Sequence, residues 1–177
     1  MVDLQSASMS SHDRDGTGHL GELAREVLDA ARHKKLSIVT AESCTAGKLA
    51  VLLSEAPGAA EHLQGGFVAY TKANKIHALG VSPDLLRRRG AVCGEVATAM
   101  ARGALARAPA DIAIAITGVA GPEPDEDGNP VGIVCIALAQ KGRPPFTFEK
   151  NYGLAARGEI QEAAMADALS ALLDALR

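Results

Sequence analysis

Short apolar segments that alternate with helical patterns constrain the fold of this chain more than any other feature. Residues 111–116 (DIAIAI) have the strongest strand pattern, and residues 132–139 (GIVCIALA) form the next such segment. Shorter segments of the same kind occupy residues 36–41 and 66–70. Between them, apolar residues recur at the spacing of a helix face, as in residues 20–31. Strands separated by helices predict an α/β fold, namely a layered α/β/α sandwich around a mixed, mostly parallel sheet.

Capping signals locate the ends of several predicted helices. Ser82 followed by Pro83 is typical of an N-cap and a first-turn proline, and Gly90 is expected to end that helix. Gly80 is the expected left-handed cap of the preceding helix. The predicted helices cover residues 20–31, 47–53, 71–79, 83–89, 95–107 and 160–176, and residues 145–152 are predicted to be a half-exposed edge strand.

The length of the chain favours one folded domain. The sequence has 177 residues, of which 47% are hydrophobic and 22% are charged, so it can form a single core. Residues 1–17 contain Ser, Asp and Gly with almost no periodic apolar pattern, so burial does not offset the entropy lost on ordering them. We therefore expect a flexible N-terminal leader over residues 1–17 and one domain over residues 18–177.

Composition and charge argue against several classes of protein. No apolar run approaches the ~18 residues of a membrane span, and the N-terminus lacks the basic and then apolar order of a signal peptide. A net charge of -3, no Trp, two Tyr and three Phe argue against a nucleic-acid surface. Cys44, Cys93 and Cys135 are too scattered for a disulfide framework or a paired-cysteine zinc site. We expect a cytoplasmic protein with free thiols and without membrane or nucleic-acid partners, structural metal or cofactor.

Polar or glycine-rich residues follow three of the predicted strands, at 42–47, 70–75 and 117–122. The carboxyl ends of strands in an α/β sheet form ligand sites because loops and helix N-termini meet there. Residues 117–130 are also the one long loop predicted inside the folded part, and loops of this length are usually either functional or disordered. These segments are the candidate walls of an active site.

Familiar catalytic arrangements around the first of these segments are not favoured. In a phosphate-binding loop, Glu42 would stand at the first glycine position and Leu49 at the Ser or Thr that holds magnesium. Lys48 is not expected to be a base for Ser43, because five residues along a helix rotate a side chain by about 140°. A Ser-His-Asp triad is not favoured either, since the histidines lie in the leader or in predicted helices.

Ser43 and Lys75 remain as candidate reactive residues. A serine at a helix start gains stabilisation of its alkoxide from the helix dipole and from backbone N–H groups. A lysine becomes a base when burial lowers its pKa toward neutrality, and a site closed by Tyr70 and apolar strand residues provides such burial. The residues alone leave an ordinary alternative open, in which Ser43 merely caps a helix and Lys75 is a solvated surface side chain.

Separated blocks of the sequence resemble the CinA C-terminal domain family. They are residues 40–47 (TAESCTAG), 65–70 (GGFVAY) with Lys75 and residues 79–81 (LGV), 117–122 (TGVAGP) and 130–132 (PVG). The matches run in the family's order from about residue 20 to residue 176. The characterised activity of the family is nicotinamide mononucleotide (NMN) deamidase. The resemblance implies a metal-independent amidohydrolase that needs no cofactor and converts NMN and water to nicotinate mononucleotide and ammonia in pyridine nucleotide recycling.

The resemblance also implies roles for particular residues. Ser43 is the implied nucleophile that attacks the carboxamide carbon, Lys75 is the implied base, and Tyr70 is expected to form hydrogen bonds near that pair. Arg157 is expected to meet the anionic part of the nucleotide. The implied substrate-binding residues are Thr45, Gly47, Thr117, Gly118, Ala120, Gly121 and Arg157. A homodimer or larger homo-oligomer is expected.

The sequence departs from the family pattern near these residues. Ala46 replaces a glycine, and its methyl group is expected either to narrow the pocket or to shift the helix start. Lys72 places a cation near Lys75, where it would lower the pKa of Lys75 or act as the base itself. Residues 123–127 (EPDED) are acidic where the family tends to be glycine-rich, so they would repel a phosphate group that they closed over.

Two further departures, Cys93 in place of a serine and Gln161 in place of an arginine, also bear on the choice of substrate. One rival interpretation is therefore the same machinery acting on a different small carboxamide. A second rival is a module that binds a nucleotide or a protein partner without turnover. Release of ammonia from NMN separates these interpretations.

Overall fold

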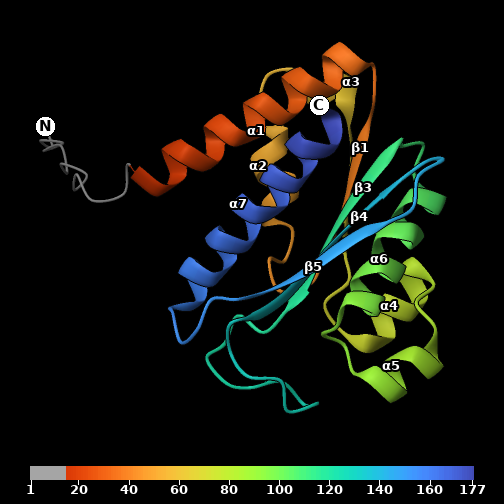
Figure 1. The fold of residues 1–177 in the computed structure, drawn as a ribbon, viewed down its shortest axis with the longest axis vertical. Helices are drawn as coiled ribbons and strands as arrows, with labels where there is room; N and C mark the ends of the chain where they lie inside the picture. Colours follow the sequence, from red (N-terminus) through yellow and green to blue (C-terminus); the bar gives the residue numbers. More distant parts are fainter. Residues whose placement is uncertain (1–14) are drawn as a thin grey trace, which may run out of the picture.

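The computed structural model describes the backbone of residues 15–177 and the side chains of residues 18–177. Its centre is a five-stranded sheet in the order β2-β1-β3-β4-β5 (Figure 1). The strands are β1 (Ile38–Glu42), β2 (Leu63–Val68), β3 (Ile112–Gly118), β4 (Ile133–Gln140) and β5 (Phe146–Asn151). β1 runs parallel to β2 and β3, whereas β4 is antiparallel to β3 and β5. The predicted mixed sheet is therefore confirmed, but only two of its four pairings are parallel, so the expectation of a mostly parallel sheet is corrected.

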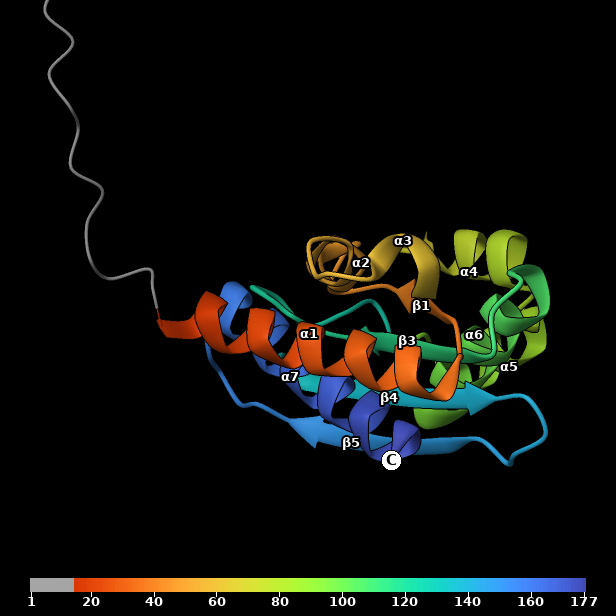
Figure 2. The same cartoon turned by 90° about the horizontal axis from the view of Figure 1, so that it is seen from above.

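Helices cover both faces of the sheet, as an α/β/α sandwich requires. α1 (Asp15–Lys34) and α7 (Arg157–Leu176) lie side by side on one face, as Figures 1 and 2 show. Leu49 and Leu53 of α2 (Lys48–Ser54) join the core on that face, and α3 (Ala59–His62) leads into β2. The other face is covered by α4 (Lys72–Leu79), α5 (Pro83–Arg89) and α6 (Gly94–Arg107).

Side-chain size along β3 sets how closely each helical layer approaches the sheet. The isoleucines of residues 112–116 belong to the core shared with α1 and α7, and the alanines between them belong to the core shared with α6. Successive strand residues point to opposite faces, so the alternating pattern places large side chains on one face and small ones on the other. The small face lets α6 pack close to β3. On the far side of α6, a Cβ at Gly103 would collide with the backbone of Leu79 in α4.

The predicted strands and helices are confirmed, with shifts of a few residues at their ends. Two differences stand out. α1 begins at Asp15, inside the range predicted as a leader, while residues 1–14 lie outside the described part of the chain. The short helix α3 was not predicted. Within residues 15–177, no helix combines the length and apolar character needed to cross a membrane.

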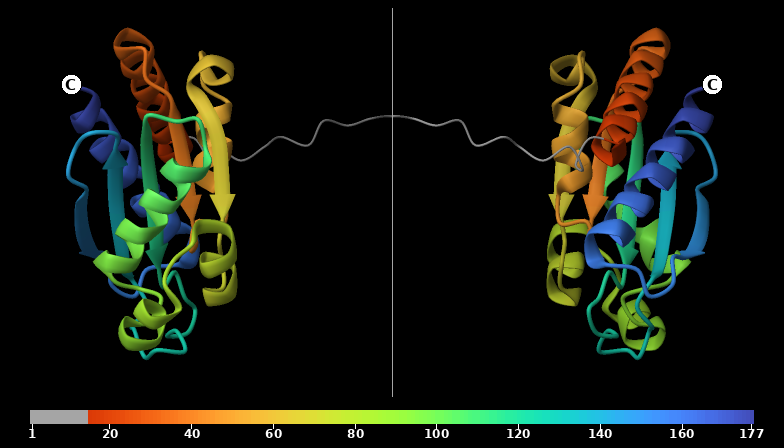
Figure 3. Two further views of the ribbon diagram at one scale, coloured as in Figure 1. Left: turned by 90° about the vertical axis from the view of Figure 1, so that its right-hand side faces the viewer. Right: turned by 90° about the vertical axis from the view of Figure 1, so that its left-hand side faces the viewer.

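The direction of the strands brings the polar segments of the sequence to one end of the molecule. The arrowheads of β1 and β2 in Figure 3 point to the end where α4 and α5 lie, together with the loop that follows β3. α7 begins at the same end, because residues 152–156 return the chain from the end of β5. This end of the sheet carries the candidate site.

Candidate active site

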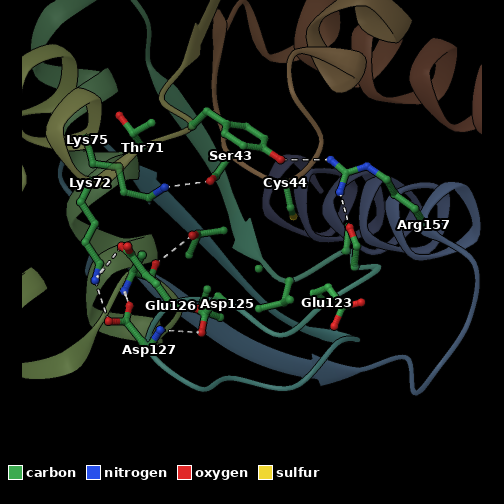
Figure 4. Close-up of a pocket in the computed structure, with 18 residues that line it drawn as sticks. Ser43, Cys44, Thr71, Lys72, Lys75, Glu123, Asp125, Glu126, Asp127 and Arg157 are labelled. Carbon is green, nitrogen blue, oxygen red and sulfur yellow. Dashed lines mark hydrogen bonds and ion pairs between the residues drawn. The ribbon is translucent and has the colours of Figure 1, made fainter.

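A cavity of about 380 Å³ opens where β1 and β3 end (Figure 4). Ser43 and Lys75 line it together with the turn of residues 117–121. The acidic residues of the loop 123–127 and Arg157 at the start of α7 also line it. The three polar segments predicted as walls of a site therefore meet in this cavity.

Ser43 and Lys75 form a buried pair in this cavity. The Nζ atom of Lys75 lies 2.7 Å from Oγ of Ser43 and 3.0 Å from the carbonyl oxygen of Ala69. Only 1% of Lys75 is exposed, and the burial lowers its pKa to about 8. The ordinary alternative, in which Lys75 is a solvated surface side chain, is therefore wrong.

Local capping in α4 aims Lys75 at the serine. Thr71 is the N-cap of α4, and its hydroxyl oxygen accepts a hydrogen bond from the backbone N–H of Asn74. Lys75 follows one turn later on the buried face of the helix, where Leu79 also packs. Gly80 closes the helix at a φ of 68°, as its sequence position predicts.

Ser43 stands in a turn between β1 and α2 rather than at the start of a helix. Its backbone N–H donates to the carbonyl oxygen of Ile116 at 2.9 Å, which extends the β1–β3 pairing by one residue. α2 begins only at Lys48, after Gly47 as the N-cap. The expectation that Ser43 lies at a helix start is therefore corrected, and so is the alternative that it caps a helix.

The carboxylate of Glu42 organises this turn. It accepts hydrogen bonds from the hydroxyls of Thr40 and Thr45 at 3.0 and 2.7 Å. It also accepts three bonds from the start of α2, where the backbone N–H groups of the N-cap Gly47 and of Leu49 and Ala50 lie at 3.0, 3.1 and 2.9 Å. Glu42 is 1% exposed, so these donors replace water around a buried carboxylate.

Two of the predicted substrate-binding residues belong to this Glu42 network and not to the cavity. Thr45 is fully buried and donates to Glu42, and Gly47 does so through its backbone. Neither residue lines the cavity. Their predicted role is corrected because the chain turns away from the cavity after Cys44. Glu42 was missed by the sequence analysis as a site residue, although an acidic residue at the end of an apolar strand was a usable signal.

A second set of contacts ties the turn to α7. Nε2 of the buried Gln161 donates to the carbonyl oxygen of Cys44 at 2.6 Å, and its Oε1 accepts from Nζ of Lys48 at 2.6 Å. Lys48 thus points to α7, which agrees with the prediction that it is not the base for Ser43. Gln161 lies one helical turn after Arg157, so the same helix positions the serine turn and the arginine.

The turn that follows β3 supplies another wall. Thr117 is 1% exposed, and its hydroxyl donates to the carbonyl oxygen of Ala91 at 2.9 Å. Gly118, Ala120 and Gly121 line the cavity beside it, as the sequence analysis expects. Gly121 has a φ of 84° and a cis peptide bond to the following proline. Its left-handed conformation favours glycine.

Tyr70 and Arg157 contact each other at the rim. Arg157 donates from Nη2 to the hydroxyl oxygen of Tyr70 at 3.2 Å and from Nη1 to the carbonyl oxygen of Gly121 at 2.6 Å. The tyrosine lines the cavity but is 54% exposed. The expectation that its hydroxyl bonds near Ser43 and Lys75 is corrected, because that hydroxyl bonds to Arg157 instead.

Lys72 is paired with the acidic loop. Its Nζ lies 2.6 Å from Oδ1 of Asp127 and 2.9 Å from Oε1 of Glu126, and these carboxylates raise its pKa. An ammonium held in this way is a poor base, and the pKa of Lys75 falls because of burial rather than because of Lys72. Both roles predicted for Lys72 are therefore corrected.

A family model described as the CinA C-terminal domain matches residues 20–176. The chain belongs to the CinA C-terminal domain family. A CinA-like protein of Mycolicibacterium vanbaalenii is 51% identical over 111 residues, and one of Prochlorococcus marinus is 42% identical over 154 residues. The matches cover 63% and 85% of this chain but 26% and 36% of those relatives, so the chain spans about a quarter to a third of their length.

Solved structures of the CinA superfamily share the whole fold. A competence/damage inducible protein from Agrobacterium tumefaciens is 36% identical, with a TM-score of 0.85 over 97% of this chain and 99% of that one. A CinA superfamily protein from Escherichia coli is 35% identical, with a TM-score of 0.84 over 97% and 95% of the two chains. The predicted fold and the resemblance are thus both confirmed.

Of the residues that depart from the CinA pattern, Lys72 and the acidic loop line the cavity, whereas Ala46, Cys93 and Gln161 do not. Ala46 is exposed at a φ of 53° and faces a groove beside α2, so its methyl group does not narrow the cavity. Cys93 is the N-cap of α6 and lies next to Val92, which does line the cavity. Cys44, beside the serine, has its pKa raised to about 12 by burial and stays a thiol at neutral pH.

Proposed function

We propose that the chain is an amidohydrolase that hydrolyses NMN to nicotinate mononucleotide and ammonia. The observation that carries the proposal is the 2.7 Å contact between Lys75 Nζ and Ser43 Oγ inside the cavity. A serine hydroxyl is a weak nucleophile until an adjacent base removes its proton. A buried lysine with a pKa of about 8 supplies that base in the pH range of the cell.

The proposed reaction has two halves. In the first, neutral Lys75 takes the Ser43 proton while Oγ attacks the carboxamide carbon and the carbonyl electrons move to oxygen. The Lys75 ammonium then protonates the nitrogen, the C–N bond breaks, and ammonia leaves an ester on Ser43. In the second half, Lys75 takes a proton from water, the hydroxide attacks the ester carbon, and Ser43 leaves as its oxygen regains the proton. An acyl-enzyme thus divides one difficult hydrolysis into two easier steps.

The walls of the cavity suit the two ends of this substrate. The Thr117 hydroxyl donates to Ala91, so its oxygen lone pairs remain to accept from the N–H of a carboxamide. Arg157 offers guanidinium donors at the rim, which match the oxygens of a phosphate. The turn of residues 118–121 lines the cavity, and we expect its main-chain N–H groups other than that of Val119, which donates to Ile133, to stabilise the oxyanion.

Release of ammonia from NMN by the purified chain tests the proposal. We expect turnover by the native protein and a loss of kcat of at least about 1,000-fold in Ser43→Ala and in Lys75→Met. Ser54→Ala and Lys141→Met are matched controls, because Ser54 bonds to its own helix and Lys141 pairs with Asp111 at the opposite end of β3. These controls should keep native turnover. An active Ser43→Ala protein would overturn the serine mechanism.

A second candidate function is hydrolysis of a different small carboxamide. The observation that favours it is the acidic loop 123–127, whose four carboxylate side chains line the cavity and oppose an anionic substrate. If the native protein does not turn over NMN, a panel of uncharged and cationic carboxamides with the same ammonia assay tests this candidate. Binding of NMN without hydrolysis would instead support a binding module.

The cellular setting of the reaction is also proposed. A deamidase of this kind would act in pyridine nucleotide recycling in the cytoplasm, as a homodimer or larger assembly. Sedimentation of the purified chain tests the assembly. No activity of the remaining length of the longer CinA-like relatives is attributed to this chain.

A further inference from the structure

The cavity proposed for an anionic nucleotide has a strongly acidic side. Glu123, Asp125, Glu126 and Asp127 all belong to one loop, and all line the cavity. Negative charges at this density oppose the approach of a phosphate unless cations offset them. The way in which each carboxylate is satisfied therefore bears on which ligands can enter.

Asp125 is satisfied inside the loop itself. Its Oδ1 accepts from the backbone N–H groups of Asp127 and Asn129 at 3.0 and 2.7 Å. Its Oδ2 accepts from the Asn129 side-chain amide at 2.8 Å. These are neutral donors, so they shape the loop and leave its negative charge in place.

Lys72 is the cation that faces the loop. It contacts Asp127 at 2.6 Å and Glu126 at 2.9 Å, and its side chain is 30% exposed. Asp127 also accepts from the backbone N–H of Ala91 at 2.9 Å, which holds the carboxylate at the cavity wall. The Lys72 contact lowers the pKa of Asp127, so both partners are charged at neutral pH.

Neither of the other cations of the cavity forms an ion pair with the acidic loop. Lys75 is buried against Ser43, and its role in the proposed function requires its neutral form. Arg157 is bonded to Tyr70 and Gly121 at the opposite rim. Figure 4 shows Lys72 beside Glu126 and Asp127 on one side of the site and Arg157 on the other.

We propose that Lys72 is a specificity-determining residue, which lets the cavity accept an anionic ligand by cancelling charge on the acidic loop. The proposal rests on the proposed function for the identity of the substrate, though not for the effect on anions in general. From the sequence, Lys72 is expected to lower the pKa of Lys75 or to act as the base itself. In the structure its ammonium instead contacts the carboxylates of the acidic loop. The expected consequence is a field effect that falls with added salt, because the Debye length is only about 10 Å at 0.1 M.

Binding of inorganic phosphate tests the field without any turnover. Backbone amide shifts of residues 117–121 would be followed by NMR during a phosphate titration at constant low ionic strength. The native protein should bind phosphate, and Lys72→Met should raise the dissociation constant for phosphate at least threefold. In the triple variant Lys72→Met/Glu126→Gln/Asp127→Asn, the dissociation constant should return to within twofold of the native value. This variant lacks the ion pairs of Lys72, but it also lacks the two negative charges that Lys72 offsets. Lys141→Met, which removes a lysine at the opposite end of the sheet, is the control for net charge and should bind as native.

Each outcome decides the proposal. Weaker binding in Lys72→Met, restored in the triple variant and reduced by salt, supports it. No phosphate binding by the native protein, an unchanged constant in Lys72→Met, or a triple variant as weak as the single one overturns it. The last result would mean that Lys72 acts only by holding the loop in position through its contacts with Glu126 and Asp127.

Kinetics with NMN separate this proposal from the proposed function. If NMN is the substrate, Lys72→Met should raise KM at least threefold with kcat within twofold of native, and the triple variant should recover KM. Phosphate binding that follows the pattern above without any ammonia release would leave the charge proposal standing and would reject the deamidase function.

Discussion

Lys75 shows how a single residue can have a structural cost and a chemical use. Its ammonium is almost fully buried and contacts one hydroxyl and one carbonyl oxygen, with burial as the main influence on its pKa. A buried charge with neutral partners destabilises the folded state. The same desolvation makes the neutral amine available near pH 8, which is what a base for Ser43 requires.

The pH dependence of stability should show this cost. The pKa of Lys75 falls from 10.5 to about 8 on folding, so between these values the unfolded chain binds more protons at this amine. As the pH rises from about 8 to 10.5, the contribution of Lys75 to the free energy of unfolding of the protein should therefore become more favourable to the folded state. The increase should be on the order of 3 kcal/mol. Urea unfolding of native protein and Lys75→Met at pH 7 and pH 10.5 measures the difference. An equal change in both proteins would contradict the prediction.

The same residue should control the rate. If neutral Lys75 is the base, kcat/KM for NMN rises with pH and levels off above about 8, since the amine must lose its proton first.

At the scale of elements, the junction of β1 and α2 is held by one side chain. Glu42 ends β1, and its carboxylate binds three N–H groups at the start of α2, where the helix dipole favours negative charge. α2 has only 7 residues, so it has few internal hydrogen bonds of its own. The intervening turn carries Ser43, so Glu42 is a positioning residue for the nucleophile that we propose.

Glu42→Gln should weaken this junction. The amide NH2 group must face donors where the carboxylate accepted from five groups, so at least one buried donor loses its partner. We expect a loss of about 2 to 4 kcal/mol in the free energy of unfolding and a lower kcat for NMN. Glu55→Gln, at the exposed end of α2, is the matched control and should change neither quantity. A fully stable and active Glu42→Gln protein would refute the positioning role.

At the scale of the whole molecule, the site depends on how the layers pack. Ser43 and Lys75 are 32 residues apart in sequence. They reach each other because β1 ends, and α4 begins, at the same end of the sheet. α4 is held in place by α6, where the missing side chain of Gly103 lets the backbone of Leu79 approach. Leu79 lies one turn after Lys75, so this close contact sets the depth at which the amine reaches the serine.

Gly103→Ala should therefore damage stability and activity together. The added methyl group cannot fit against the Leu79 backbone, so α4 must move away from α6. Overpacking of this kind costs about 1 to 3 kcal/mol. We expect kcat/KM for NMN to fall at least fivefold as Lys75 shifts relative to Ser43. Gly21→Ala in α1 is the control: its new methyl group meets no atom within 4 Å, so the variant should be at least as stable as native and equally active.

Local patterns account for what the sequence could predict. The α/β class, the strand at residues 111–116 and the caps at Ser82, Gly80 and Gly90 follow from hydrophobic periodicity and turn chemistry, which act between neighbours in the chain. The polar segments that follow the strands gave Ser43 and Lys75 as candidate reactive residues and placed them at the carboxyl ends of strands, and the resemblance to the family implied their roles.

Only the tertiary structure decided what each polar side chain contacts. Tyr70 bonds to Arg157, Thr45 bonds to Glu42, and Lys72 pairs with the acidic loop. The sequence had instead placed Tyr70 near Ser43 and Lys75, Thr45 at the substrate, and Lys72 beside the base. The physical reason is that a hydrogen bond or ion pair depends on distances of about 3 Å between groups far apart in sequence. The sequence determined which segments become strands and helices and which chemical groups stand at their ends. Packing of the layers determined which of those groups meet, which are buried, and which face water.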